Sequence, residues 1–229
     1  MLFKPFALLT LTLFISQSAL AFQTQKDTEP IYFEGSVTFQ SSFNGRVTST
    51  VTRHFTKEHF KMVYESSAMP MMGSQDLGEV IYDFKNLKIA KVKHKEKTVV
   101  YKPSPDIENA KKPEVTPKEE WAEVLGHRCQ KYEVKTTDLS GKSLSYSIWV
   151  ADDLRVTHLD GHAFLTAYGS NIAAAFEHTD GLVLRIDMFD DQGNAVGLDE
   201  AIEVRPEKLD LKVFNIPGKA DNYRVSGDY

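Results

Sequence analysis

The sequence predicts a mainly β, antiparallel chain with a few short helices, and three observations support this prediction. Apolar and polar residues alternate with a period of two over most of the chain beyond residue 30, which is the spacing that gives a strand one apolar face. The alternating runs are short and are separated by turn-forming residues such as Asn44-Gly45, a pair typical of hairpins. Only residues 116–125 and 163–176 have the character of helices. The length suits one domain with a substantial core.

The N-terminal residues predict an export signal. A basic residue precedes an apolar run over residues 6–15, and Ala19-Leu20-Ala21 supplies the small residues of a signal-peptidase site. The apolar run is too short to span a bilayer, and no comparable second segment follows it. We therefore expect a signal peptide over residues 1–21. The domain over residues 22–229 is expected to be periplasmic or secreted, soluble after cleavage and without a transmembrane segment.

Composition and charge narrow the possible partners. The chain has 27 basic and 32 acidic residues, dispersed along the sequence, and a net charge of −5. Nucleic acids and anionic membranes bind clustered cations, so neither is an expected partner. The single cysteine, Cys129, cannot form an internal disulfide and is most simply interpreted as a small buried residue at the start of a strand. No cofactor is expected.

Six short strands are expected in the first half of the chain. They cover residues 31–39, 46–55, 60–64, 80–84, 88–93 and 98–101. In the first three strands, apolar residues two positions apart share one face. These same-face residues are Phe33, Val37, Phe39, Val51, Phe55, Met62 and Tyr64. Polar side chains such as Thr50 and His54 occupy the other face, so this part of the sheet is expected to bury one side.

Two irregular segments interrupt the strands. Residues 66–78 contain Met69-Pro70-Met71-Met72-Gly73, and we expect a mobile apolar loop there because Pro and Gly exclude a regular strand. Residues 102–117 contain four prolines among charged residues and are expected to form a surface connection. Thr116-Pro117-Lys118-Glu119 then has the pattern of an N-cap, a first-turn proline and a capping-box glutamate, which predicts a short helix that ends at Gly126.

Strands resume in the second half of the chain. They are expected at residues 129–135, 144–150, 184–188 and 196–204, with a turn at residues 190–194. The alanine-rich residues 163–176 are a second helical candidate, which Gly169-Ser170 weakens. The alternating pattern then closes with Leu209, Leu211, Val213 and Phe214-Asn215-Ile216-Pro217.

Several segments together resemble a known superfamily. Residues 126–134 (GHRCQKYEV) and 147–154 (SIWVADDL) are similar to the core motif of a bacterial family of uncharacterised exported domains related to the outer-membrane lipoprotein-sorting (lipoprotein-carrier) proteins. Residues 69–72 and 214–217 are similar in kind to segments of that family. The resemblance implies a curved antiparallel half-barrel, in which one sheet wraps over a few short helices and encloses an apolar cavity. Better-studied members carry or sense acyl chains and lipoproteins, and no residue here matches a known cargo contact.

The expected function follows from this implied apolar concave face, which cannot be left in water. We expect a non-enzymatic binding protein that shields a hydrophobic small molecule or acyl chain. The expected cavity wall consists of the same-face residues named above and Trp149, and the expected lid consists of Met69, Met71 and Met72, whose thioether side chains adapt to different acyl shapes. The simpler interpretation of each wall residue is ordinary core packing.

Three alternatives stay open at this point. The same fold could serve as a scaffold that binds an envelope protein through an edge strand or the methionine loop. The methionines, with His54, His59 and His94, could bind Cu(I), although their spacing matches no closed site. An enzyme is disfavoured because His158 and His162 lack the glutamate of a metalloprotease signature, and no nucleophile elbow or phosphate loop is present. No catalytic residue and no metal ligand are assigned.

Overall fold

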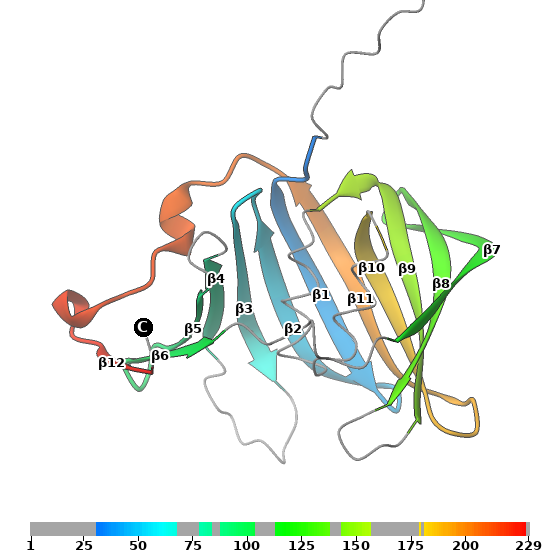
Figure 1. Ribbon diagram of the computed structural model, residues 1–229, viewed down its shortest axis with the longest axis horizontal. Coiled ribbons are helices and arrows are strands. Elements are labelled where there is room, and N and C mark those ends of the chain that lie inside the picture. Colours follow the sequence, from blue (N-terminus) through cyan, green and yellow to red (C-terminus); the bar gives the residue numbers. More distant parts are fainter. Residues whose placement is uncertain are drawn as a thin grey trace, which may run out of the picture. The chain divides into compact units, whose positions relative to one another are not determined.

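A single 12-stranded sheet forms the framework of the chain in the computed structural model (Figure 1). The structure describes residues 31–67, 78–83, 88–103, 113–137, 143–156, 179 and 181–227. The strands are β1 (Gly35–Phe43), β2 (Arg46–Phe55), β3 (His59–Ser67), β4 (Glu79–Asp83), β5 (Lys88–Lys93), β6 (Thr98–Pro103), β7 (Glu114–Val124), β8 (His127–Thr137), β9 (Ser143–Arg155), β10 (Gly181–Phe189), β11 (Ala195–Pro206) and β12 (Arg224–Ser226). The helices among the described residues are two short 3-10 helices, η2 (Leu211–Phe214) and η3 (Lys219–Asp221).

Two meanders meet at the centre of this sheet. The strand order is β12-β6-β5-β4-β3-β2-β1-β11-β10-β9-β8-β7, so β1 pairs with β11 where the meanders join. All pairings are antiparallel except that of β12, which runs parallel to β6. The sheet is curved and does not close, since β7 and β12 are separate edges (Figure 1). This architecture confirms the predicted mainly β, antiparallel half-barrel. No described helix is long and apolar enough to cross a membrane.

The first meander follows the alternation of the sequence closely. All six expected strands are present, and β2 and β5 have the expected bounds. Asn44 and Gly45 have φ angles of 48° and 72°, which are the left-handed conformations that a tight two-residue hairpin requires. The turn fixes the register of β1 and β2 and places Phe39 opposite Val51, which in turn lies opposite Tyr64 of β3.

The helix predicted from Thr116 to Leu125 is wrong, because these residues belong to edge strand β7 and its turn. Strand β7 pairs with β8, and Leu125 and Gly126 turn the chain with φ angles of 52° and 84°. Pro117 is tolerated because an edge strand has one side without a neighbouring strand, and the register shifts between Pro117 and Trp121. Cross-strand pairing along β7 therefore outweighs the local capping signals. The predicted surface connection also ends earlier than expected, since β7 begins at Glu114.

The second meander contains every expected strand, each longer than the sequence suggests. The turn at residues 190–194 is confirmed, with the Asp190 carboxylate accepting hydrogen bonds from the backbone N–H groups of Gln192 and Asn194. Residues 209–217 do not form the expected strand. They contain η2 and are followed by η3 and by β12, which the sequence did not reveal. The predicted signal peptide, the centre of the methionine loop and the helical candidate at 163–176 lie outside the described residues.

Side chains on the two faces of the first meander belong to different hydrophobic clusters. One face of β1–β5, which we call the apolar face, contributes to the largest cluster, and Phe60, Tyr82 and Ile89 are buried members of it. Ile81, Ala90, Val92 and Val99 point to the opposite face, where residues 216–225 of the C-terminal segment pack against them. A third cluster, centred on Ile148 and Ile186, belongs to β7–β10.

Candidate functional site

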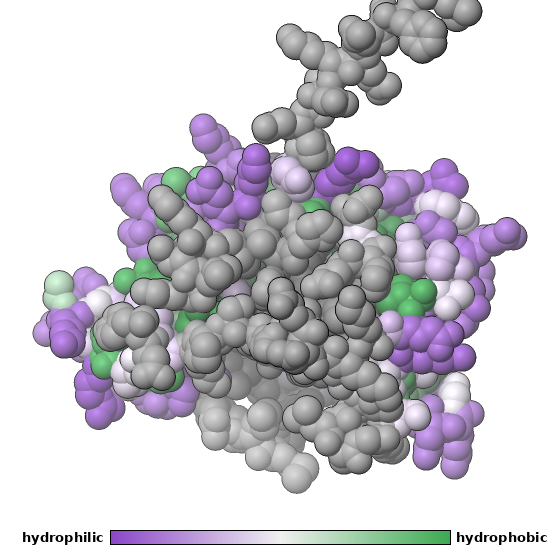
Figure 2. All heavy atoms as spheres, in the orientation of Figure 1, coloured by the Kyte–Doolittle hydropathy of each residue, from purple (hydrophilic) through white to green (hydrophobic). Residues whose placement is uncertain are grey.

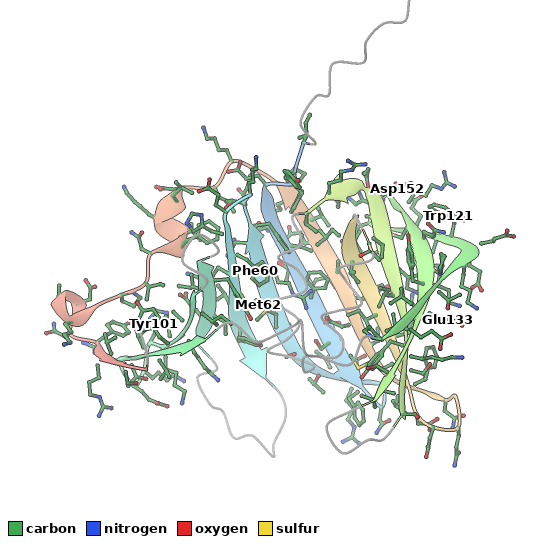
Figure 3. The ribbon with its side chains drawn as sticks, in the orientation of Figure 1. Phe60, Met62, Tyr101, Trp121, Glu133 and Asp152 are labelled. Atoms are coloured by element: carbon green, nitrogen blue, oxygen red, sulfur yellow. The ribbon has the colours of Figure 1, made fainter. Side chains whose placement is uncertain are left out.

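The apolar face brings most of the predicted wall residues together. Phe33, Val37, Phe39, Val51, Phe55 and Met62 are buried members of one hydrophobic cluster, and Tyr64 is partly buried against it. Met69, Met71 and Met72, the predicted lid, lie outside the described residues. Figure 3 shows Phe60 and Met62 near the middle of the sheet, whereas Trp121 and Glu133 lie toward the β7 end and Tyr101 toward the β12 end.

Aromatic rings line one row of this face. Phe55, Phe60, Tyr82 and Ile89 lie opposite one another on successive strands. The ring centres of Phe55 and Phe60 are 5.0 Å apart, and those of Phe60 and Tyr82 are 5.6 Å apart. Tilted and edge-on pairs at these separations stabilise the row beyond the burial of its area. The row gives the apolar face a continuous set of large apolar side chains from β2 to β5.

A charged pair is buried within this apolar face. Arg53 of β2 donates from Nη2 to Oδ2 of Asp199 on β11, at 3.0 Å, and their side chains are 7% and 1% exposed. The guanidinium carbon lies 3.8 Å from the centre of the Phe39 ring, so Arg53 crosses β1 over that ring to reach Asp199. Side chains from the strands on either side of β1 therefore meet on this face of the sheet.

Ser41 and Met62 are further neighbours of the charged pair. Ser41 donates a hydrogen bond to Oδ1 of Asp199 at 2.7 Å, so both carboxylate oxygens accept one. Met62 lies opposite Arg53 in the β2–β3 register. Each charge of the pair therefore has an opposite charge beside it, as a buried charge needs, and the pair lies beside buried members of the apolar cluster such as Phe39.

Tyr64 adds a hydroxyl group beside the charged pair. Burial raises the pKa of Tyr64 above its usual value, while the positive charge of Arg53 lowers it and the negative charge of Asp199 raises it. Both charges therefore act on the ring, and the neutral phenol is the form present at physiological pH. No hydrogen bond of the Tyr64 hydroxyl is found to any described residue. The hydroxyl can act as a hydrogen-bond donor beside the charged pair.

Trp149, the wall residue predicted on a later strand, is partly buried against the same cluster and has polar neighbours. Its indole N–H donates to Oδ2 of Asp187 at 2.8 Å, and Arg185 donates to the other carboxylate oxygen at 2.8 Å. Arg185 also reaches Glu200 at 3.3 Å. Both carboxylate oxygens of Asp187, a residue of β10, therefore accept hydrogen bonds. This network holds Trp149 in one orientation at the edge of the apolar cluster.

The opposite face of the first meander is closed by the C-terminal segment. Lys61 donates from Nζ to the Val213 carbonyl at 3.0 Å and pairs with Glu79 at 2.8 Å. Two of the histidines considered for copper binding have structural partners here. His59 stacks on Phe214 with ring centres 5.2 Å apart, and Nδ1 of His94 lies 2.7 Å from the Tyr223 hydroxyl. Among the described residues, no three His, Cys, Asp or Glu side chains are grouped as a metal site.

Neither residue of the buried pair, Arg53 or Asp199, was predicted from the sequence as part of the site. A signal was present, because Arg53 has the same parity as Val51 and Phe55 and so interrupts an apolar face with a charge. Its partner is 146 residues away, and pairing with β1 brings both to one place. Cys129 is buried as expected, and burial raises the pKa of its thiol to about 11, so the thiol is not an activated nucleophile.

Figure 2 shows the described residues on one side of the molecule. Hydrophilic side chains predominate there, and hydrophobic groups are small and separate from one another. Single exposed apolar residues of this kind are normal on a protein surface.

Comparison with known proteins gives matches at the level of structure. No protein-family model and no curated protein matches the chain. An uncharacterised conserved protein from Thermus thermophilus matches with a TM-score of 0.54 and 8% identity, over 86% of this chain and 92% of that one. PNGF-II matches with a TM-score of 0.50 and 16% identity over 86% of this chain, which spans 31% of PNGF-II.

A LolA superfamily protein, NE2245 from Nitrosomonas europaea, matches over 82% of this chain and 92% of that one, with 7% identity and a TM-score of 0.30. At sequence identities this low, a structural match gives information about the fold alone. The chain itself has the curved, unclosed antiparallel sheet that the resemblance in the sequence implies.

Proposed function

We propose that this protein is an exported, non-enzymatic binding protein that holds a hydrophobic, lipid-like ligand against the apolar face. The observation that carries the proposal is a large apolar cluster on one face of a single open sheet. The apolar face of a sheet must be kept from water, and a hydrophobic ligand held against it contributes to that cover. The proposed site also includes residues that the sequence pattern predicts for the wall and the lid, namely Phe33, Trp149 and the methionines of residues 69–72.

The first test is native mass spectrometry of the protein purified from its own cells without detergent. We expect a population heavier than the polypeptide by the mass of an amphiphile, which organic extraction releases. We also expect the extracted protein to bind an apolar fluorescent probe such as N-phenyl-1-naphthylamine. A homogeneous species of polypeptide mass that binds no such probe would contradict the proposal.

A photo-cross-linker locates the ligand. Tyr64 and Tyr101 are both partly buried tyrosines on strands, the first against the apolar face and the second on the opposite face. With benzoylphenylalanine at position 64, irradiation in cells should attach a small amphiphile. The same group at position 101 is the matched control and should attach none. Equal labelling at both positions would show that the ligand is not held on the apolar face.

A second candidate function is protein binding through β7. This strand is an edge of the sheet, and an edge presents backbone groups that another strand can pair with. Trp121 on β7 is 42% exposed, and the Arg128 guanidinium lies 3.8 Å from the centre of its ring system, so a flat, exposed aromatic platform adjoins the edge. Cross-linking from position 121 distinguishes the two functions. A scaffold would give one stoichiometric protein adduct, whereas a carrier would give only transient ones.

A further inference from the structure

We propose that Arg53, Asp199 and Tyr64 form a polar anchor that selects ligands with an uncharged, hydrogen-bonding head group, such as an ester or amide, over ligands with a carboxylate. The inference rests on the proposed function, because the anchor lies within the same apolar face. It adds the chemical class of the ligand's polar end. An acyl ester or amide would place its alkyl chain against the aromatic row and its carbonyl oxygen at the anchor.

The anchor already contains two opposite charges that offset each other, those of Arg53 and Asp199, 3.0 Å apart. A ligand carboxylate beside them would bring a further negative charge among buried apolar atoms, at a large cost in desolvation. A carbonyl group brings no charge, so it avoids this cost.

Tyr64 supplies the anchor with a hydrogen-bond donor. A carbonyl oxygen needs a donor once it leaves water. The Tyr64 hydroxyl makes no hydrogen bond with the described residues, and the phenol is protonated at neutral pH, so it can donate to such an oxygen. Tyr64 and Arg53 lie on neighbouring strands, two register positions apart on the same face, which is within reach of two long side chains.

Packing alone does not require a charged pair at positions 53 and 199. A buried ion pair can often be replaced by apolar residues of similar volume with no loss of stability. The Arg53–Asp199 pair lies beside buried apolar residues, so apolar side chains at these two positions would have apolar neighbours. A role in recognising the polar end of a ligand gives the pair a function that packing does not.

The test compares three C12 compounds as competitors of bound N-phenyl-1-naphthylamine at pH 7.5: methyl dodecanoate, dodecanoate and dodecane. We expect the ester to displace the probe at least about tenfold more effectively than the carboxylate or the hydrocarbon. The preference for the ester over the carboxylate should shrink as the pH falls toward the carboxylate's own pKa. Equal displacement by all three compounds, or stronger displacement by dodecanoate, would overturn the anchor and leave the proposed function standing. No displacement by any compound would overturn both.

Two variants separate recognition from folding. Tyr64→Phe removes only the hydroxyl, and we expect it to weaken ester binding about five- to tenfold while dodecane binding stays unchanged. The double variant Arg53→Met/Asp199→Leu is expected to fold and to bind the ester no better than dodecane. An ester preference unchanged in both variants would overturn the proposal. Thermal unfolding of each variant confirms that it is folded.

Discussion

Removal of Asp199 alone should be one of the most damaging changes on the apolar face. Asp199→Ala takes away the carboxylate that lies 3.0 Å from the buried Arg53 guanidinium and compensates its charge. Loss of one partner of a buried pair costs about 3–5 kcal/mol, or roughly two to three and a half factors of ten in the unfolding equilibrium. The Phe39 ring beneath the guanidinium offsets a small part of this loss.

Urea unfolding followed by fluorescence measures the effect. The matched control is Glu203→Ala, which breaks an ion pair with Arg205 in which both side chains are exposed, and we expect a change within about 0.5 kcal/mol. The double variant Arg53→Met/Asp199→Leu should recover most of the loss, because no uncompensated charge is left. A loss below about 1 kcal/mol for Asp199→Ala would refute the reasoning, since it would mean that water reaches the guanidinium.

Three further predictions follow from burial and backbone geometry. Phe39→Ala should cost about 3–5 kcal/mol in urea unfolding, and Phe43→Ala, at an exposed ring on the same strand, less than about 1 kcal/mol; similar losses would contradict the difference in burial between the two rings. Gly35→Ala should destabilise the protein by about 1–3 kcal/mol, because Gly35 has a φ of 153° and a Cβ there would collide with the Arg205 carbonyl; an unchanged melting temperature would contradict this. The raised pKa of Cys129, about 11, means that the folded protein holds the thiol proton more tightly than the unfolded chain, so stability should fall as the pH rises from about 9 to 11. Cys129→Ala should make that dependence less steep, and a slope unchanged by the substitution would show that other groups, such as the buried Tyr64, cause it.

The strands could be predicted well where a local pattern and the tertiary fold agree. The Asn44-Gly45 turn and the alternation on either side of it define β1 and β2 without knowledge of the rest of the chain. The same local reasoning failed for residues 116–125, where a capping-box pattern predicts a helix. The register shift between Pro117 and Trp121 hides the period of two, and the pairing with β8 that decides the outcome is not visible in the local sequence.

The candidate site was predictable only in its apolar part. Val37, Phe39, Val51 and Phe55 share parity, and parity alone assigns them to one face. The Arg53–Asp199 pair depends on the meeting of two meanders at β1 and β11, which joins residues 146 positions apart. No spacing rule in the sequence links two such residues, so their proximity required the structure.

Methyl NMR during ligand titration tests the central claim most directly. Ile89 and Ile81 are similarly buried isoleucines on neighbouring strands, the first in the cluster of the apolar face and the second in the cluster of the opposite face. In the isoleucine-labelled protein, addition of methyl dodecanoate should shift the Ile89 δ1-methyl signal and leave that of Ile81 in place. A saturable shift of Ile81 without a shift of Ile89 would contradict ligand binding on the apolar face.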